Sequence, residues 1–198
     1  MLLCFATNNK HKLGEISGLI KSDFKILSLQ DIGCLEEVPE TLPTIQENSF
    51  AKADYVFRNY HVDCFADDTG LEVNALGGEP GVLSARYAGE NKNSDDNIDM
   101  LLRNLLNKYD RSARFRTVIT LIIGGSSFQF EGIIKGNITD NRRGFHGFGY
   151  DPVFLPDNYG LTFAEMSADQ KNLISHRAIA TRKLVEFLNS LNINRSKQ

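Results

Sequence analysis

The sequence is poor in the features that mark membrane, secreted and polyanion-binding proteins. No segment approaches the ~20 apolar residues that a membrane-spanning helix needs, and the opening MLLCFA is too short and lacks the basic leader of a signal peptide. With 22 basic and 25 acidic residues the net charge is -3, so no excess of positive charge is present for binding polymeric nucleic acid. We expect a soluble cytoplasmic protein whose partners include neither a membrane nor a nucleic-acid polymer.

Cysteine is scarce as well. Cys4, Cys34 and Cys64 lie far apart and form no C-x-x-C pair, which argues against a zinc site and against a disulfide framework. A reducing cytoplasm fits this pattern. The 198 residues are 41% hydrophobic and 24% charged, which is typical of a globular protein that buries a substantial core. We expect one domain over residues 1–198, or two lobes that share one sheet.

The spacing of the apolar residues predicts an α/β fold. The predicted elements are strands at 2–6 and 24–29 and before Asp67, helices at 10–20, 46–60 and 167–191, a helix capped by Ser94 or Asp95, and a hairpin of runs 113–123 and 127–134 around Gly124-Gly125. A β-α-β unit followed by a hairpin implies a mixed, twisted central sheet flanked by helices.

The segment from Phe65 to Gly89, FADDTGLEVNALGGEPGVLSARYAG, combines two adjacent carboxylates with five glycines. We predict that it is too polar and broken to be a core element. The short apolar run before it ends at Asp67-Asp68, and acids at the end of a strand lie at the rim of a sheet, where α/β proteins bind ligands. Two adjacent carboxylates repel each other unless they share a proton or a cation. The alternative is that one of them only caps the turn at Thr69-Gly70.

The run Thr7-Asn8-Asn9-Lys10-His11-Lys12 lies in the predicted turn between the first strand and the first helix. A helix N-terminus offers backbone N–H groups and the positive end of the helix dipole, so it favours an anion. Side-chain donors from Thr7 and Asn9 and the charge of Lys10 or Lys12 would suit a polyphosphate. The alternative is an N-cap at Thr7 or Asn8 followed by two solvated lysines.

Glu40 lies in an acidic, proline-containing loop from Asp31 to Thr44, whose length indicates a functional or mobile segment. Phosphate chemistry needs an offset for the substrate's charge, and Mg²⁺ held by one or two carboxylates and the phosphates is a common device. Glu40 with Asp67-Asp68 could hold such an ion, or one of these acids could act as a general base. The alternative for Glu40 is a solvated loop acid.

Two stretches near the C-terminal end carry further candidates. The run GFHGFGYDP from Gly144 to Pro152 offers a stacking face at Phe148 and an acceptor for ring N–H groups at Asp151, which indicates a base pocket. The alternative is an aromatic-glycine turn at the sheet edge. On the last predicted helix Lys171 and Ser175 share a face, whereas the His176-Arg177 pair points elsewhere, and a basic run of this kind is ordinarily a solvated face.

Taken in order, the motifs TNNKHK, FADDTGLEVNALGGEPGVLSARYAG, GFGYDPVF and TFAEMSADQKNLISHRA resemble the inosine triphosphatase family, from Ala6 to about Ala180. The resemblance implies hydrolysis of deaminated purine nucleoside triphosphates (XTP, ITP and dITP) to the monophosphate and pyrophosphate, by a Mg²⁺-dependent homodimer. It also implies two lobes with the active site in the cleft between them. Two alternatives stay open: a pyrophosphatase acting on modified pyrimidine nucleotides, and a non-catalytic nucleotide- or RNA-binding module.

The resemblance also implies a role for each matched residue. Asp68 takes the place of the catalytic proton acceptor, and Glu40 and Asp68 take the places of the metal ligands, although the residues alone leave Asp67 open as the base. The residues implied to bind substrate are Thr7, Asn8, Asn9, Lys10, His11, Lys12, Thr69, Phe148, Gly149, Tyr150, Asp151, Lys171, His176 and Arg177.

Overall fold

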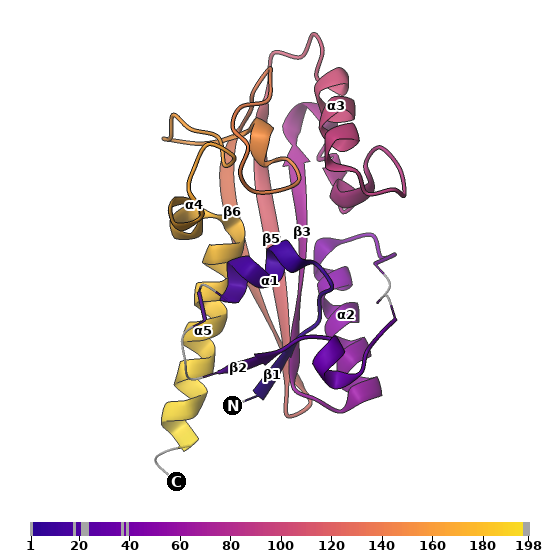
Figure 1. The fold of residues 1–198 in the computed structure, drawn as a ribbon, viewed down its shortest axis with the longest axis vertical. Helices are drawn as coiled ribbons and strands as arrows, with labels where there is room; N and C mark the ends of the chain where they lie inside the picture. The colour runs from indigo at the N-terminus through magenta and orange to yellow at the C-terminus, as the bar shows by residue number, and fades with distance from the viewer. Residues whose placement is uncertain (1, 18, 21–23, 37, 39, 196–198) are drawn as a thin grey trace. The chain divides into compact units, whose positions relative to one another are not determined.

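The computed structural model describes residues 2–195 apart from residues 18, 21–23, 37 and 39 (Figure 1). The chain divides into two compact units. The first unit comprises residues 1–68, 117–132 and 177–198, and the second comprises residues 69–116 and 133–176.

The main elements of the described part of the chain are one mixed sheet and five α-helices, with short 3-10 helices at residues 30–32, 74–76, 84–86 and 151–153. The strands are β1 (Leu2–Phe5), β2 (Lys25–Leu27), β3 (Cys64–Val73), β4 (Pro80–Gly81), β5 (Ser112–Ile123), β6 (Ser126–Ile138) and β7 (Phe154–Pro156). The helices are α1 (Lys10–Ser17), α2 (Ile45–Tyr60), α3 (Ser94–Asn104), α4 (Ala168–Ile174) and α5 (His176–Arg195). The strand order is β2-β1-β3-β5-β6-β7, with β4 beside β3. Strand β1 is parallel to β2 and β3, whereas β4 and β7 are antiparallel to their neighbours, so the predicted mixed α/β architecture is confirmed.

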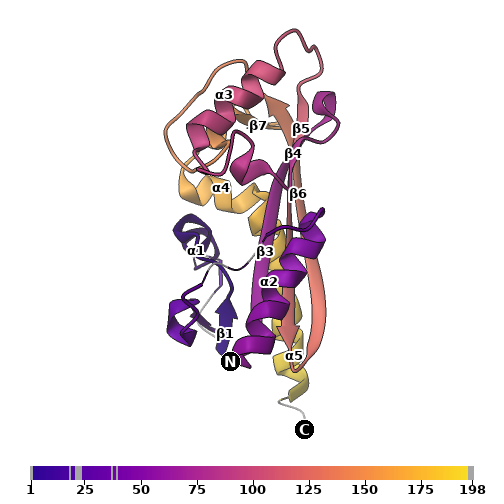
Figure 2. The same cartoon turned by 90° about the vertical axis from the view of Figure 1, so that its right-hand side faces the viewer.

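In the first unit, helices cover both faces of the sheet (Figures 1 and 2). Successive strand residues point to opposite faces, so β1 divides its side chains between two apolar clusters. Leu3 and Phe5 pack in a cluster with residues of α1 and α5, and the ring of Phe5 stacks on Phe65 with centroids 4.6 Å apart. Cys4, and Ala6 directly after the strand, lie in the other cluster, which includes residues of α2. No helix in the described part of the chain is long and apolar enough to span a bilayer.

The second unit has its own core, in which α3 packs against strand residues and aromatic side chains. Phe115 is its centre, with ring centroids 4.6 Å from Phe154 and 6.1 Å from Phe163. The cap of α3 differs from the prediction. Asn93, and not Ser94 or Asp95, is the N-cap, because its side-chain oxygen accepts the backbone N–H groups of the first turn.

The hairpin prediction is confirmed, and its strands are longer than expected. Gly124 and Gly125 join β5 to β6 with φ angles of 55° and 79°. Two consecutive positive φ angles match the twist of a two-residue hairpin and favour glycine at both positions.

Other boundaries differ from the predictions. The second predicted strand is shorter, at residues 25–27, and the first helix ends at Ser17, next to residue 18, which lies outside the described residues. The single C-terminal helix is two helices, because Ser175 has an extended backbone with a ψ of 154° and ends α4. The prediction that the polar segment after Phe65 is too broken for a core element is wrong for its first part, because β3 runs through both aspartates to Val73.

Candidate active site

The turn between β1 and α1 is organised by Asn9. Its side-chain oxygen accepts the backbone N–H groups of His11 at 2.9 Å and Lys12 at 3.3 Å, while its own N–H donates to Thr7 Oγ1 at 3.2 Å. Asn9 therefore takes the capping role that the sequence assigned to Thr7 or Asn8. The side chains of Asn8, Lys10 and His11 are exposed.

Lys12 differs from Lys10 because its ammonium group turns into the protein. Its Nζ lies 3.0 Å from Asp67 Oδ1, and only 14% of its side chain is exposed. Burial lowers the pKa of Lys12, and the nearby positive charges of Lys52 and Arg177 lower it further against the attraction of Asp67. The alternative of two solvated lysines is therefore wrong for Lys12.

Asp67 is the anion at the centre of this cluster. It binds Lys12 through one carboxylate oxygen, and its Oδ2 accepts from Arg177 Nε at 3.1 Å. Burial by itself would raise the pKa of Asp67, but Lys12, Arg177 and Lys52 more than reverse this, so the pKa lies well below its ordinary value. Asp67 thus stays ionised and engaged by cations, which makes it a poor acceptor for a further proton.

Asp68 has the opposite behaviour although it is the next residue. Burial raises its pKa, and the negative charges of Glu40 and Asp67 raise it further, against the influence of Lys52 and Lys12. Its Oδ1 lies 3.3 Å from Lys52 Nζ. A carboxylate whose pKa is raised holds a proton more strongly, so the arrangement favours Asp68 over Asp67 as a proton acceptor.

Lys52, which the sequence analysis missed, connects the two acidic segments. Its ammonium group forms ion pairs with Glu40 and Asp68 and donates to the backbone oxygen of Asp67 at 2.6 Å. Burial acts against its charge, yet the surrounding carboxylates raise its pKa above the ordinary value. The missed signal was its position: Lys52 falls at helical spacing on the buried stripe of α2 with Ser49 and Val56.

Arg177 is buried, with 1% of its surface exposed, so the alternative of a solvated basic face is wrong here. Besides Asp67, its guanidinium group binds the carboxylate of Glu15 on α1. Glu15 was also missed by the sequence analysis, since an acid in the middle of a short helix carries no distinctive pattern. The guanidinium group therefore lies where it supports Asp67, which in turn binds Lys12.

A second set of predicted residues is assembled within the second unit around Asp151. Its Oδ2 accepts from the backbone N–H of Phe148 at 2.8 Å and from Lys171 Nζ at 2.6 Å. Lys171 Nζ also lies 4.9 Å from the centroid of the Phe148 ring, within cation–π range. At Gly147 an added Cβ would lie 2.0 Å from Asp151 Oδ2, and φ is 77°, so the motif needs glycine at this position.

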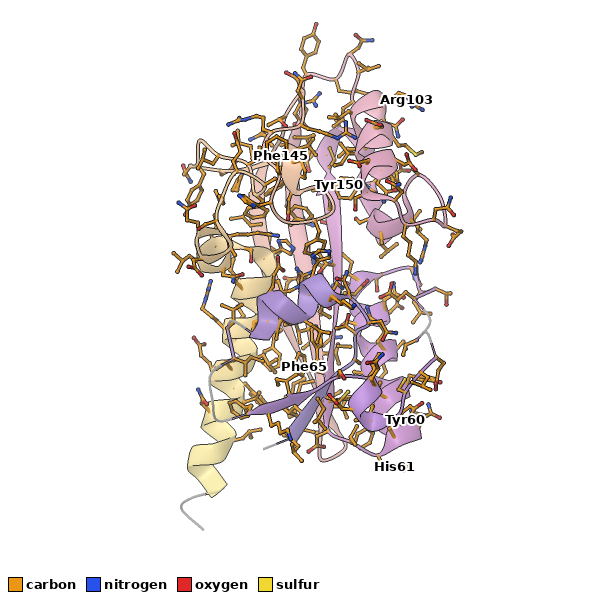
Figure 3. The ribbon with its side chains drawn as sticks, in the orientation of Figure 1. Tyr60, His61, Phe65, Arg103, Phe145 and Tyr150 are labelled. Carbon is orange, nitrogen blue, oxygen red and sulfur yellow. The ribbon has the colours of Figure 1, made fainter. Side chains whose placement is uncertain are left out.

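The neighbouring candidates are more deeply buried than their motif indicated. The His176 ring stacks on Phe115 with centroids 4.5 Å apart and is 3% exposed. Tyr150, labelled in Figure 3, donates its hydroxyl to the backbone oxygen of Ser84 at 2.9 Å, and burial raises its pKa. Gly149 has a φ of 60°, and Thr69 is half-buried in β3 directly after Asp68. Ser175 does not share a helical face with Lys171, since it lies in the break between α4 and α5.

The donors available for a metal ion are few. Among the described residues no three His, Cys, Asp or Glu side chains converge on one point. Glu40 and Asp68 do converge as a pair on the ammonium group of Lys52. Two carboxylates suit an ion that takes its remaining ligands from substrate phosphates and water, as Mg²⁺ commonly does.

Comparisons with known proteins show what the chain as a whole is similar to. The model of the Ham1 family matches residues 3–187. A dITP/XTP pyrophosphatase of Flavobacterium johnsoniae is 54% identical over 188 residues, which cover 95% of this chain and 98% of that protein. A dITP/XTP pyrophosphatase of Bacillus subtilis is 42% identical over 187 residues, which cover 92% and 94%. Among solved structures, the Staphylococcus aureus Ham1 protein matches with a TM-score of 0.88 at 38% identity, covering 96% of this chain and 99% of that chain. A HAM1 protein from Coxiella burnetii matches with a TM-score of 0.89 at 33% identity and the same coverage.

Proposed function

We propose that this chain, which belongs to the Ham1 family, hydrolyses deaminated purine nucleoside triphosphates to the nucleoside monophosphate and pyrophosphate. The membership confirms the resemblance to the inosine triphosphatase family that the four motifs indicated. The chain is a nucleoside-triphosphate pyrophosphatase, and ITP, dITP and XTP are its substrates. Their removal would keep deaminated bases out of DNA and RNA.

The proposal rests on two adjacent carboxylates in the first unit that lie among buried cations and have opposite pKa shifts. Asp67 is held ionised by Lys12 and Arg177, whereas the neighbouring Asp68 has a raised pKa. Adjacent carboxylates whose pKa values are pushed apart in this way are a common source of distinct acid–base roles. A binding module would have no need for such a division.

In the proposed mechanism the Thr7–Lys12 turn binds the phosphates. Its exposed side chains and the N-terminal end of α1 would face the anionic chain, and Lys12 would offset charge on the departing pyrophosphate. Asp68 accepts the proton of a water that attacks the α-phosphorus, the α–β anhydride bond breaks, and pyrophosphate leaves with the bond's electron pair. Positioning and charge stabilisation would supply most of the acceleration.

We propose Mg²⁺ as the cofactor, with Glu40 and Asp68 as its protein ligands. Their shared contact with Lys52 supports this, because two carboxylates already face one cation. When bound, the ion would neutralise phosphate charge and lower the pKa of the attacking water. Lys52 would then keep both carboxylates ionised and oriented.

For the base we assign the set around Asp151 in the second unit. Phe148 would stack on the ring, while Lys171 fixes the orientation of Asp151 through their buried ion pair. A purine 6-keto group is an acceptor where adenine has an amino donor, so donors such as His176 or a backbone N–H would favour hypoxanthine and xanthine. We retain Thr69, Gly149 and Tyr150 in the substrate-binding set, and assign Arg177 to holding Asp67.

Three further features belong to the proposal. Residues 1–198 would act as one nucleoside-triphosphate pyrophosphatase domain, because β3, β5 and β6 each contribute residues to both units. The enzyme would be a cytoplasmic homodimer, and a nucleotide rather than a nucleic-acid polymer would be its partner.

A substrate panel tests the proposal. We expect kcat/KM for ITP, dITP and XTP to exceed that for ATP and GTP at least about a hundredfold, which is ~2.7 kcal/mol and within reach of one or two unmade hydrogen bonds at the base. Rates are measured with Mg²⁺, and the products are separated by chromatography. Equal rates on ATP and ITP, or release of orthophosphate, would contradict the base assignment or the point of attack.

A further inference from the structure

The loop that carries Glu40 contacts α2 at three positions, and we call the described residues among 33–44 (all except 37 and 39) the Glu40 loop. Near its end, the backbone N–H of Leu42 donates to Asn48 Oδ1 at 2.9 Å, and its carbonyl accepts from Asn48 Nδ2 at 3.0 Å. In the middle, Glu40 pairs with Lys52. Near its start, Glu36 Oε1 accepts from the hydroxyls of Tyr55 at 2.7 Å and Tyr60 at 2.6 Å.

The order of these contacts defines how the loop runs. Residues 48, 52 and 55 are spaced four and three apart, so they form one stripe along α2. Their loop partners come in reverse order, at residues 42, 40 and 36. The described residues of the Glu40 loop that make these contacts are therefore arranged antiparallel to α2 along a single stripe, and Figure 3 places Tyr60 at the end of that helix. The sequence predicted a functional or mobile loop. In its described residues, the structure shows a loop that these contacts hold against α2.

Buried apolar side chains also hold the Glu40 loop against α2. Cys34 and Val38 are buried, and they belong to the cluster that contains Ala53 and Val56 of α2. Glu36 itself stands at the surface. Its hydrogen bonds from Tyr60 and Tyr55 lower its pKa to about 2, so the carboxylate that holds the two hydroxyls stays ionised at every pH at which the enzyme would work.

The contacts on both sides of Glu40 restrict where its carboxylate can go. A glutamate on a long loop would otherwise sample many positions, and a metal ligand or lysine partner must be held within about half an ångström of its working place. Asn48 binds the backbone two residues after Glu40, and the tyrosine hydroxyls bind the side-chain carboxylate of Glu36, four residues before it.

We propose that Glu36, Tyr55, Tyr60 and Asn48 are positioning residues that hold Glu40 beside Lys52 and Asp68. The proposal deepens, and rests on, the proposed pyrophosphatase function, in which Glu40 binds the metal ion. These four residues act through Glu40 and touch neither substrate nor metal. Their loss should weaken metal binding and lower kcat, while discrimination between ITP and ATP stays unchanged.

The test uses the full chain with Tyr55→Phe and Tyr60→Phe combined, which removes both hydroxyls and keeps both rings. Two readouts are independent of turnover: exchange of the Leu42 amide hydrogen, and calorimetric affinity for Mn²⁺ with the α,β-imido analogue of ITP. We expect faster exchange and affinity weakened at least about threefold, the change that loss of hydrogen bonds of this type produces. Arg58→Gln is the matched control, because it removes an exposed ion pair with Asp54 on the same helix.

A graded pair of variants separates positioning from a general structural effect. Glu36→Gln keeps an acceptor for the tyrosines, so it should retain more Mn²⁺ affinity than Glu36→Ala. Unchanged Leu42 exchange and Mn²⁺ affinity within about twofold of wild type in the double variant would overturn the proposal. If wild type releases no pyrophosphate from ITP, the proposed function fails, while amide exchange still decides whether the tyrosines hold the loop.

Discussion

Replacing each aspartate of the Asp67-Asp68 pair by asparagine should produce two different defects. In Asp67→Asn, Lys12 and Arg177 lose the carboxylate that both bind, and Arg177 is 1% exposed. Removing one partner of a buried ion pair leaves a charge uncompensated and costs about 3–5 kcal/mol. Glu15 still binds Arg177, so we expect the lower part of this range. For a chain of this length that loss corresponds to a fall in Tm of roughly 6–12 °C.

In Asp68→Asn, Lys12 and Arg177 keep Asp67 as their partner, while Lys52 loses its contact with Asp68. Lys52 retains Glu40 and the backbone oxygen of Asp67, so the fold should be nearly as stable as wild type. The amide cannot accept the proton of the attacking water, and loss of a general base lowers kcat by about 10²–10⁴. The variants are compared by thermal unfolding and by pyrophosphate release from ITP. An Asp68→Asn enzyme with more than about a tenth of wild-type kcat, or a Tm loss equal to that of Asp67→Asn, would refute the division of roles.

Three further outcomes are expected. Lys12→Ala should raise KM for ITP and lower kcat, because its charge meets phosphate in both ground and transition states; equal losses of affinity for ITP and IMP would contradict this. Because the pKa of Asp68 is raised above 3.8 and its ionised form is the base, kcat/KM should fall as pH decreases through that pKa, and Asp68→Asn should lose this acid limb. Gly147→Ala would push Asp151 away from Lys171, so steady-state kinetics should show a reduced ITP-to-ATP preference, with binding of inorganic pyrophosphate as the unaffected control.

Two of the errors in the predicted elements have identifiable causes. The segment after Phe65 was expected to be broken because it combines two acids with five glycines. Strand β3 nevertheless continues through the acids, since Lys12, Lys52 and Arg177 neutralise the buried carboxylates. Nothing local to the segment reveals those cations. The break at Ser175 was missed for a different reason, because helical spacing continues on both sides of it.

The sequence identified the candidate site residues only as separate motifs, and it did not show which side chains contact one another. Each motif carries a local signal that short-range chemistry explains: a polar turn before a helix, acids after an apolar run, and glycines beside an aromatic ring. Lys52 and Glu15 had no such signal, since each is one charged residue on a helix that has several. Their significance depends on partners at positions 40, 68 and 177.

By itself the sequence determined the α/β class, the hairpin and the four motifs, because hydrophobic periodicity, paired glycines and capping chemistry act within a few residues. Only the tertiary structure decided which of two adjacent aspartates stays ionised and which has the raised pKa. Electrostatic interactions depend on distance in space and on burial, and Lys12, Lys52 and Arg177 reach Asp67 from three helices far apart in the chain.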